Sequence, residues 1–74
     1  MHEVGAKTLA ALRERFPEFE LVGHETNYNN VLTITFWQDG KRWTVRSPSE
    51  DDYRQRPYMW WLHRFGTEIK RKLG

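Results

Sequence analysis

The chain has 74 residues, with twelve Lys and Arg against ten Asp and Glu, and a formal net charge of +2. This length predicts a single domain over residues 1–74 with one small core. No cysteine is present, which excludes disulfides and thiolate metal sites. The eleven Trp, Phe and Tyr residues must therefore supply much of the buried area. The three histidines, His2, His24 and His63, show no ligand spacing, so no metal or cofactor is expected.

Neither an apolar signal-peptide segment nor a run of about 18 apolar residues occurs, so we expect no membrane partner. The lack of cysteine fits a cytoplasmic location. Residues 1–37 carry three basic and five acidic side chains, and residues 38–74 carry nine basic and five acidic ones, giving net charges of −2 and +4. This asymmetry indicates an anionic partner for the second half, although ordinary solvated charge explains it too.

The first predicted element is a helix over residues 5–16. Leu9, Leu12 and Phe16 recur at i, i+3 and i+7, which places them on one face. Pro17 ends the helix, because a residue that precedes proline is displaced from the α region.

An alternating segment at residues 18–22 places Phe19 and Leu21 on one side, which predicts a strand. Residues 23–30 are rich in turn-forming side chains and predict a loop. Residues 31–38 are β-branched and aromatic throughout most of their length and form the clearest strand.

Asp39-Gly40 connects this strand to a further strand at residues 41–47. The Asp-Gly pair favours a two-residue type I′ turn, which needs positive φ at both positions, and such a turn sets the strand register. One face of the hairpin, predicted to belong to the core, carries Leu32, Ile34, Phe36, Trp43 and Val45. The opposite face, predicted to be solvated, carries Thr33, Thr35, Trp37, Arg42, Thr44 and Arg46.

Residues 49–52 resemble a helix capping box with Ser49 as the N-cap, and residues 49–55 predict a short turn. The main second helix is predicted to begin near Pro57. Its apolar residues follow helical spacing and are Tyr58, Trp61, Leu62, Phe65, Ile69 and Leu73. Gly66 lies inside this stripe and suggests a close approach to the sheet.

The predicted class is therefore α+β, in the order α-β-β-β-α, with a three-stranded antiparallel meander and two helices packed on one face. This order resembles that of double-stranded-RNA-binding domains. Those domains carry a Lys-rich cluster at the start of the second helix, where this chain has the acidic residues 50–52. Small mRNA-cleaving toxins of the same fold place a histidine at the first hairpin, which Gly23-His24 resembles only loosely. No family is assigned on this topology.

The solvated sheet face is the first candidate site. Trp37 opposite Arg42 offers a flat ring, which suits a base, beside a guanidinium fork, which suits a phosphate. The alternative is a cation–π pair between these two side chains on an ordinary solvated sheet. The predicted nucleic-acid-binding residues are Trp37, Arg42, Arg46, Arg64, Lys70 and Arg71.

The outer face of the last helix is the second candidate site. Trp60 adjoins Trp61, and one narrow helix face cannot bury both rings. Met59, Trp60 and His63 therefore form a predicted protein interface. The alternative is that Trp60 packs beneath the first helix or the segment 48–56.

No catalytic arrangement is recognisable, since His24 has no evident nucleophile or orienting partner and the acidic residues 50–52 suit helix capping. We therefore expect a small binding module without enzymatic activity. Its partner would be a nucleic acid or a larger protein, for instance an enzyme of nucleic acids. The alternative is a protein-interaction module, such as a phage-type inhibitor, an adaptor or a homodimer.

Overall fold

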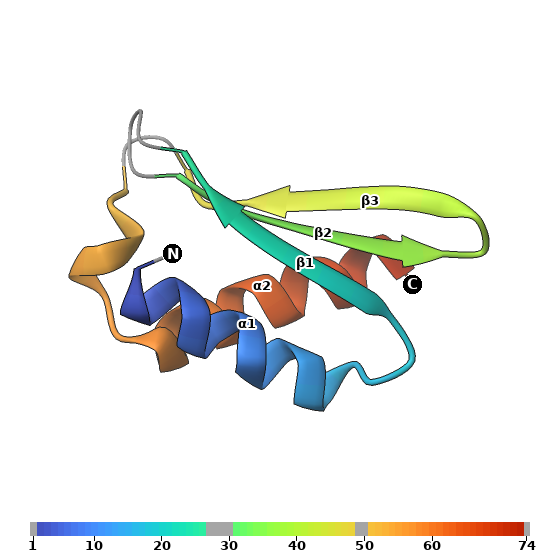
Figure 1. Ribbon diagram of the computed structural model, residues 1–74, viewed down its shortest axis with the longest axis horizontal. Coiled ribbons are helices and arrows are strands. Elements are labelled where there is room, and N and C mark those ends of the chain that lie inside the picture. The colour runs from blue at the N-terminus through green and yellow to red at the C-terminus, as the bar shows by residue number, and fades with distance from the viewer. Residues whose placement is uncertain (1, 27–30, 49–50, 74) are drawn as a thin grey trace.

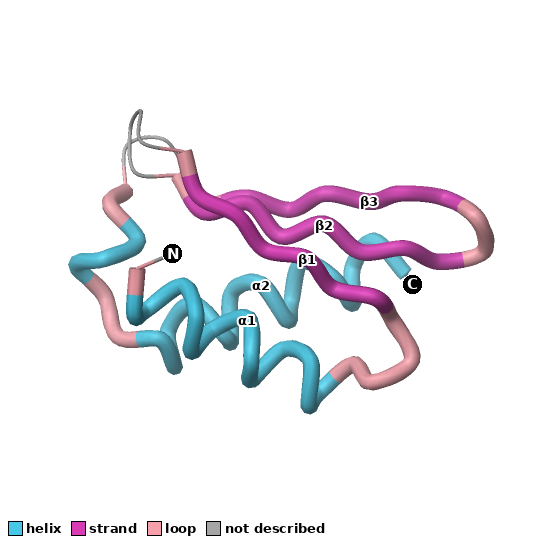
Figure 2. The backbone as a smooth tube through the Cα atoms, viewed as in Figure 1, coloured by secondary structure: helices cyan, strands magenta, loops and turns pink. Residues whose placement is uncertain are grey.

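The computed structural model describes residues 2–26, 31–48 and 51–73. The elements, in chain order, are α1 (Glu3–Arg15), β1 (Glu20–Glu25), β2 (Leu32–Gln38), β3 (Lys41–Arg46), the short 3-10 helix η1 (Tyr53–Gln55) and α2 (Tyr58–Leu73). The strands form one antiparallel sheet in the order β1-β2-β3, and both helices lie on the same side of it (Figures 1 and 2). The predicted α+β fold is confirmed.

The β2–β3 hairpin has the predicted turn and the predicted register. Asp39 and Gly40 have φ angles of 52° and 75°, as a type I′ turn requires. The register then pairs Trp37 with Arg42 and Phe36 with Trp43 and continues to the pair of Thr33 with Arg46. The two residues of the turn therefore decide which side chains of both strands face the helices.

The helix-covered face of the sheet contains the centre of the core. Leu32, Ile34 and Phe36 are fully buried, and Val45 is nearly so. They belong to one cluster with residues from both helices, namely Leu9, Leu12, Trp61, Leu62, Phe65 and Ile69. The alternation of β2 and the stripe of α2 thus meet as expected.

Trp43 differs from its prediction as a core residue, because it is only half-buried and packs at the margin of the cluster. It lies on β3, which is an edge of the sheet. The Lys72 ammonium nitrogen lies 6.0 Å from the centroid of its ring. The edge position leaves one side of the ring without a neighbouring strand.

The bounds predicted for the first strand were wrong. β1 begins at Glu20 and includes Gly23, His24 and Glu25, which had been predicted as loop. Those three residues pair with β2 in the same register as the start of the strand. Pairing with a distant strand outweighs the local preference of Gly and His. Residues 27–30 of the predicted loop lie outside the described residues.

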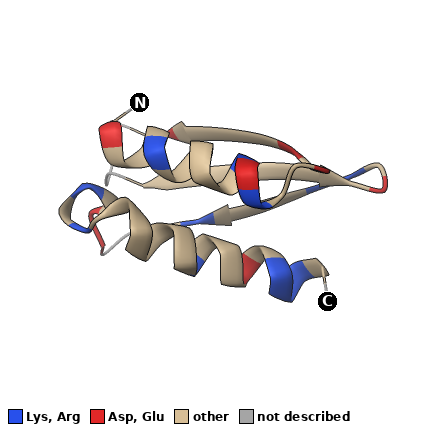
Figure 3. Cartoon of the chain, turned by 90° about the horizontal axis from the view of Figure 1, so that it is seen from below, with Lys and Arg blue, Asp and Glu red and all other residues tan. Residues whose placement is uncertain are grey.

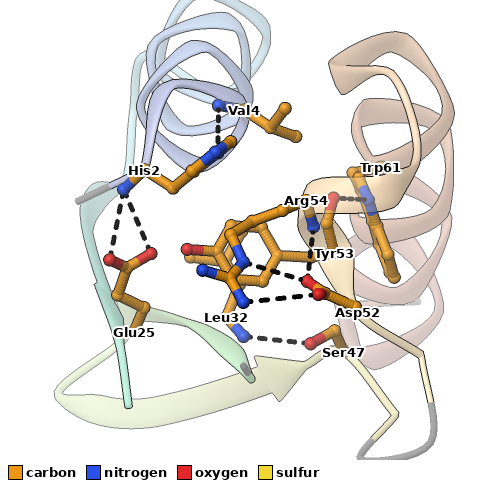
Figure 4. Close-up of polar contacts among 9 residues, drawn as sticks. All are labelled: His2, Val4, Glu25, Leu32, Ser47, Asp52, Tyr53, Arg54 and Trp61. Atoms are coloured by element: carbon orange, nitrogen blue, oxygen red, sulfur yellow. Dashed lines mark hydrogen bonds and ion pairs between the residues drawn. The ribbon is translucent and has the colours of Figure 1, made fainter. Parts of the chain in front are cut away.

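α1 begins two residues before its predicted start. The Nδ1 atom of His2 accepts a hydrogen bond from the backbone N–H of Val4 at 3.2 Å, so His2 is the N-cap. The backbone N–H of His2 donates to both carboxylate oxygens of Glu25 at 3.2 and 3.1 Å (Figure 4). The start of α1 is thereby joined to the end of β1.

Gly66 lies against α1, and the predicted close approach to the sheet was wrong. A Cβ atom built on Gly66 would lie 3.3 Å from Nη1 of Arg15, at the end of α1. The missing side chain therefore makes room for an arginine of the other helix.

The connection between β3 and α2 is anchored in the core. Tyr53 of η1 is buried, and its carbonyl accepts a hydrogen bond from the indole N–H of Trp61 at 2.7 Å (Figure 4). The carboxylate of Asp52 caps η1 by accepting from the backbone N–H of Arg54 at 3.0 Å. The predicted N-cap, Ser49, lies outside the described residues.

The two outer edges of the sheet differ. On β1, the Arg13 guanidinium donates to the carbonyl of Leu21 at 3.1 and 3.2 Å. On β3, the residues Arg42, Thr44 and Arg46 occupy the positions of the hairpin that are not bonded to β2, so their backbone groups point outward. No residue in the described part of the chain bonds to those groups. The β3 edge is therefore open.

Candidate nucleic-acid interface

The face of the sheet turned away from the helices is an array of three rows. Residues paired across antiparallel strands project to the same side, so the register of both strand pairs defines the array. From β1 to β3 the rows are Glu20, Trp37 and Arg42; Val22, Thr35 and Thr44; and His24, Thr33 and Arg46. We call this array the open face. It contains the predicted site residues Trp37, Arg42 and Arg46.

Trp37 and Arg42 lie side by side without covering each other. The side chain of Trp37 is 44% exposed. Within the described part of the chain, the cation–π contacts involve the rings of Trp60 and Trp43, and none involves Trp37. The alternative of a Trp37–Arg42 cation–π pair is therefore not formed. Both the ring and the guanidinium of this row remain available to a ligand.

A hollow of about 340 Å³ lies between β3 and α2. Its lining consists of Thr44, Val45 and Arg46 from β3 and of Arg64, Phe65, Glu68, Arg71 and Lys72 from α2. Four cations thus surround one carboxylate, which already accepts a hydrogen bond from Arg71 at 2.6 Å. This basic hollow brings three predicted site residues, Arg46, Arg64 and Arg71, to one place from two elements.

The remaining predicted cation is separate from the hollow. Lys70 is exposed on α2 but does not line it. Figure 3 shows that most of the Lys and Arg positions of α2 lie toward the C-terminal end of the helix. Arg42 and Arg46 lie on one face of β3, four residues apart, which corresponds to roughly 13 Å along a strand. The open face and the basic hollow are therefore continuous through Arg46.

Two residues of this site were missed from the sequence. Lys72 follows Arg64 and Glu68 at successive steps of four residues, so the i+4 spacing of α2 would have found it. Glu20 joins the row of Trp37 only through the β1–β2 register. The long connection between those strands gave no signal for that register.

The predicted protein interface is divided by the structure. Trp60 is half-buried, packs edge-on against Trp61 with ring centroids 4.6 Å apart, and has the Arg56 and Arg64 guanidinium carbons 4.2 and 5.6 Å from its centroid. Trp60 and the exposed His63 line a shallow depression of about 350 Å³ on α2.

Met59, which is 58% exposed, belongs to a different hollow between the two helices. Met59 therefore does not share a depression with the other two residues of the predicted interface.

A metal site, a membrane-spanning helix or a catalytic group would each indicate another function if present among the residues that the structure describes. They contain no group of three or more His, Asp or Glu side chains that could hold a metal ion. Their helices also include none with the length and apolar character needed to cross a membrane. His24 lies on the open face in the row of Thr33 and Arg46. The carboxylate of Asp52 is engaged by the side chain of Arg54.

Comparison of the chain with protein-family models, with curated proteins and with solved structures finds no match. The geometry of this molecule is therefore the basis for its proposed function.

Proposed function

We propose that the chain is a non-enzymatic nucleic-acid-binding module that uses the open face and the basic hollow. The observation that carries the proposal is the basic hollow itself, where Arg46 of β3 meets Arg64, Arg71 and Lys72 of α2. These cations come from two different elements. Charges that served only solubility would be expected to lie apart on the surface instead of lining one hollow. A polyanion that follows β3 would contact all of them.

The type of polyanion follows from the side chains beside the hollow. Guanidinium forks match the geometry of phosphate oxygens, and a flat exposed ring suits a nucleic-acid base. Trp37 and Arg42 supply both in one row of the open face. A phosphate-rich ligand without bases would make use of the arginines only. A cytoplasmic location, where such ligands are abundant, is part of this proposal.

The test is fluorescence anisotropy with labelled short single strands and duplexes of DNA and RNA. We expect micromolar binding at low salt that weakens steeply between about 50 and 200 mM salt, because bound phosphates release counterions. The double variant R46Q/R64Q should weaken binding by roughly tenfold.

A matched control removes the same charge elsewhere. Lys7 and Arg54 are exposed, pair with Glu3 and Asp52, and do not line the basic hollow. The double variant K7Q/R54Q should therefore bind almost like the unaltered chain. If no nucleic acid binds at low salt, or if both double variants lose the same affinity, the proposal is wrong.

A second candidate function is protein binding through the depression on α2. It is favoured by the position of Trp60, whose ring centroid lies 4.2 and 5.6 Å from the guanidinium carbons of Arg56 and Arg64 and which lines this depression with the exposed His63. An inhibitor, an adaptor or a homodimer would use such a surface. Replacing Thr67, which lines the depression, with Arg should abolish any dimer seen by sedimentation, whereas nucleic-acid binding should not weaken, because the added charge lies beside Arg64.

A further inference from the structure

Resting on the proposed function, we infer that the open face takes single-stranded nucleic acid and stacks a base with an exocyclic amino group on Trp37. Glu20 and Arg42 lie on either side of that ring, on β1 and β3. The row therefore presents an acceptor, a stacking surface and a donor in order across the sheet. We call it the stacking row.

The stacking row has space for a base. Neighbouring strands are about 5 Å apart, so the row spans roughly 10 Å from Glu20 to Arg42. The adjacent row, Val22, Thr35 and Thr44, has short side chains. They leave the region beside the Trp37 ring clear, and both helices lie on the other side of the sheet (Figure 1).

The exposed ring favours a single strand over a duplex. In a duplex the faces of the bases are hidden in the stack, so a ring on the sheet could meet only base edges or the sugar-phosphate backbone. A single strand can turn a base outward onto the ring, and base–aromatic stacking is a main source of affinity in such complexes. An indole that is 44% exposed and has no cation over it is suited to that contact.

The charges of the stacking row orient the nucleotide. Arg42 attracts a phosphate and Glu20 repels one, so the phosphate belongs on the β3 side. From Arg42 the backbone can follow the open edge of β3 to Arg46 and enter the basic hollow. One nucleic-acid strand on this path would contact both the open face and the basic hollow.

Glu20 then determines the type of base. An ionised carboxylate only accepts hydrogen bonds. Within the described residues, Glu20 has no ion pair or side-chain hydrogen bond of its own. Cytosine, adenine and guanine offer an exocyclic amino group to such an acceptor, as in the known pairing of Glu with cytosine N4. Thymine and uracil offer carbonyl oxygens on both sides of their one ring N–H, and these face the carboxylate unfavourably.

The test compares oligo(dC) with oligo(dT), which have rings of equal size, and with a duplex of mixed sequence. We expect oligo(dC) to bind roughly fivefold more tightly than oligo(dT). The variant W37A should weaken both single strands by about tenfold, and W37F should retain most of the affinity, because a phenyl ring still stacks. E20Q should bring the two oligonucleotides to similar affinity, since an amide both donates and accepts.

The outcomes separate this inference from the proposed function. If R46Q/R64Q weakens binding but W37A does not, or if the duplex binds as tightly as the single strands, the inference is overturned and the proposed function stands. Equal binding of oligo(dC) and oligo(dT) by the unaltered chain overturns the role of Glu20. Binding of none of these probes at low salt overturns the proposed function itself. Urea unfolding of each variant shows whether it is folded.

Discussion

The two faces of the sheet are made of alternating residues of the same strands, and they differ in burial and in the polarity of their side chains. On β2, Leu32, Ile34 and Phe36 have no exposed surface, whereas Trp37 is 44% exposed. The covered face excludes water, and the open face offers a ring, hydroxyls and guanidinium groups to it. Substitutions one residue apart along a strand should therefore separate stability from binding.

The largest effect is expected on the covered face. Phe36→Ala should lower the free energy of unfolding by about 3–5 kcal/mol, because it leaves a cavity among the residues of both helices. A chain of this size has little stability in reserve, so the variant should be largely unfolded at room temperature. Urea unfolding followed by circular dichroism measures this.

The control for Phe36→Ala is Trp37→Ala, which should change the free energy of unfolding by less than about 1 kcal/mol. Similar losses for both variants would show that the two faces are not energetically distinct.

A smaller loss of stability is expected at Ser47, the residue that directly follows β3. The hydroxyl of Ser47 is fully buried and accepts a hydrogen bond from the backbone N–H of Leu32 at 2.9 Å (Figure 4). Ser47→Ala should cost about 1–3 kcal/mol, because the buried N–H loses its side-chain acceptor. Thr44→Ala, an exposed change on the open face, should cost about 0.5 kcal/mol. Thermal unfolding of the two variants compares them, and an equal shift would argue against a buried role for Ser47.

The smallest effect concerns a carboxyl group that belongs to neither face. The side-chain hydrogen bond from Arg54, helped by the Arg54 backbone N–H, lowers the pKa of Asp52 below its ordinary value of 3.8. A carboxyl whose pKa is lowered in the folded state stabilises the fold above its unfolded pKa, and the stabilisation is lost as the pH falls through the folded pKa.

Asp52→Asn should therefore lower stability slightly at neutral pH and make its decline below about pH 4 less steep. Urea unfolding across an acidic pH series detects this. A decline as steep in the variant as in the unaltered chain would mean that other carboxyl groups are responsible for it.

The parts of the fold that could be predicted from the sequence have local causes. Asp39-Gly40 specifies its own turn, and a two-residue turn leaves one register for both strands. The faces of Phe36 and Trp37 then follow from alternation alone. The stripe of α2 likewise follows from helical spacing within a single element.

The parts that could not be predicted depend on distant partners. β1 extends to Glu25 because β2 offers it a pairing strand, which no residue of that segment indicates. Trp43 is half-buried because its strand is at the sheet edge, and Trp60 is half-buried because it packs at the margin of the core cluster against Trp61. For the candidate site, the individual cations could be selected from the sequence. Their meeting in one hollow required the packing of β3 against α2.

The open edge of β3 has a consequence for how molecules of this chain meet in solution. An uncovered edge strand is a template on which a second molecule can continue the sheet, the first step of aggregation. If two β3 strands paired antiparallel around Thr44, Arg42 of each would lie opposite Arg46 of the other, and like charges directly opposed are destabilising. In that register the repulsion between the arginines opposes continuation of the sheet from one molecule to the next. Because salt screens such repulsion between exposed charges, this protection is strongest in dilute buffer.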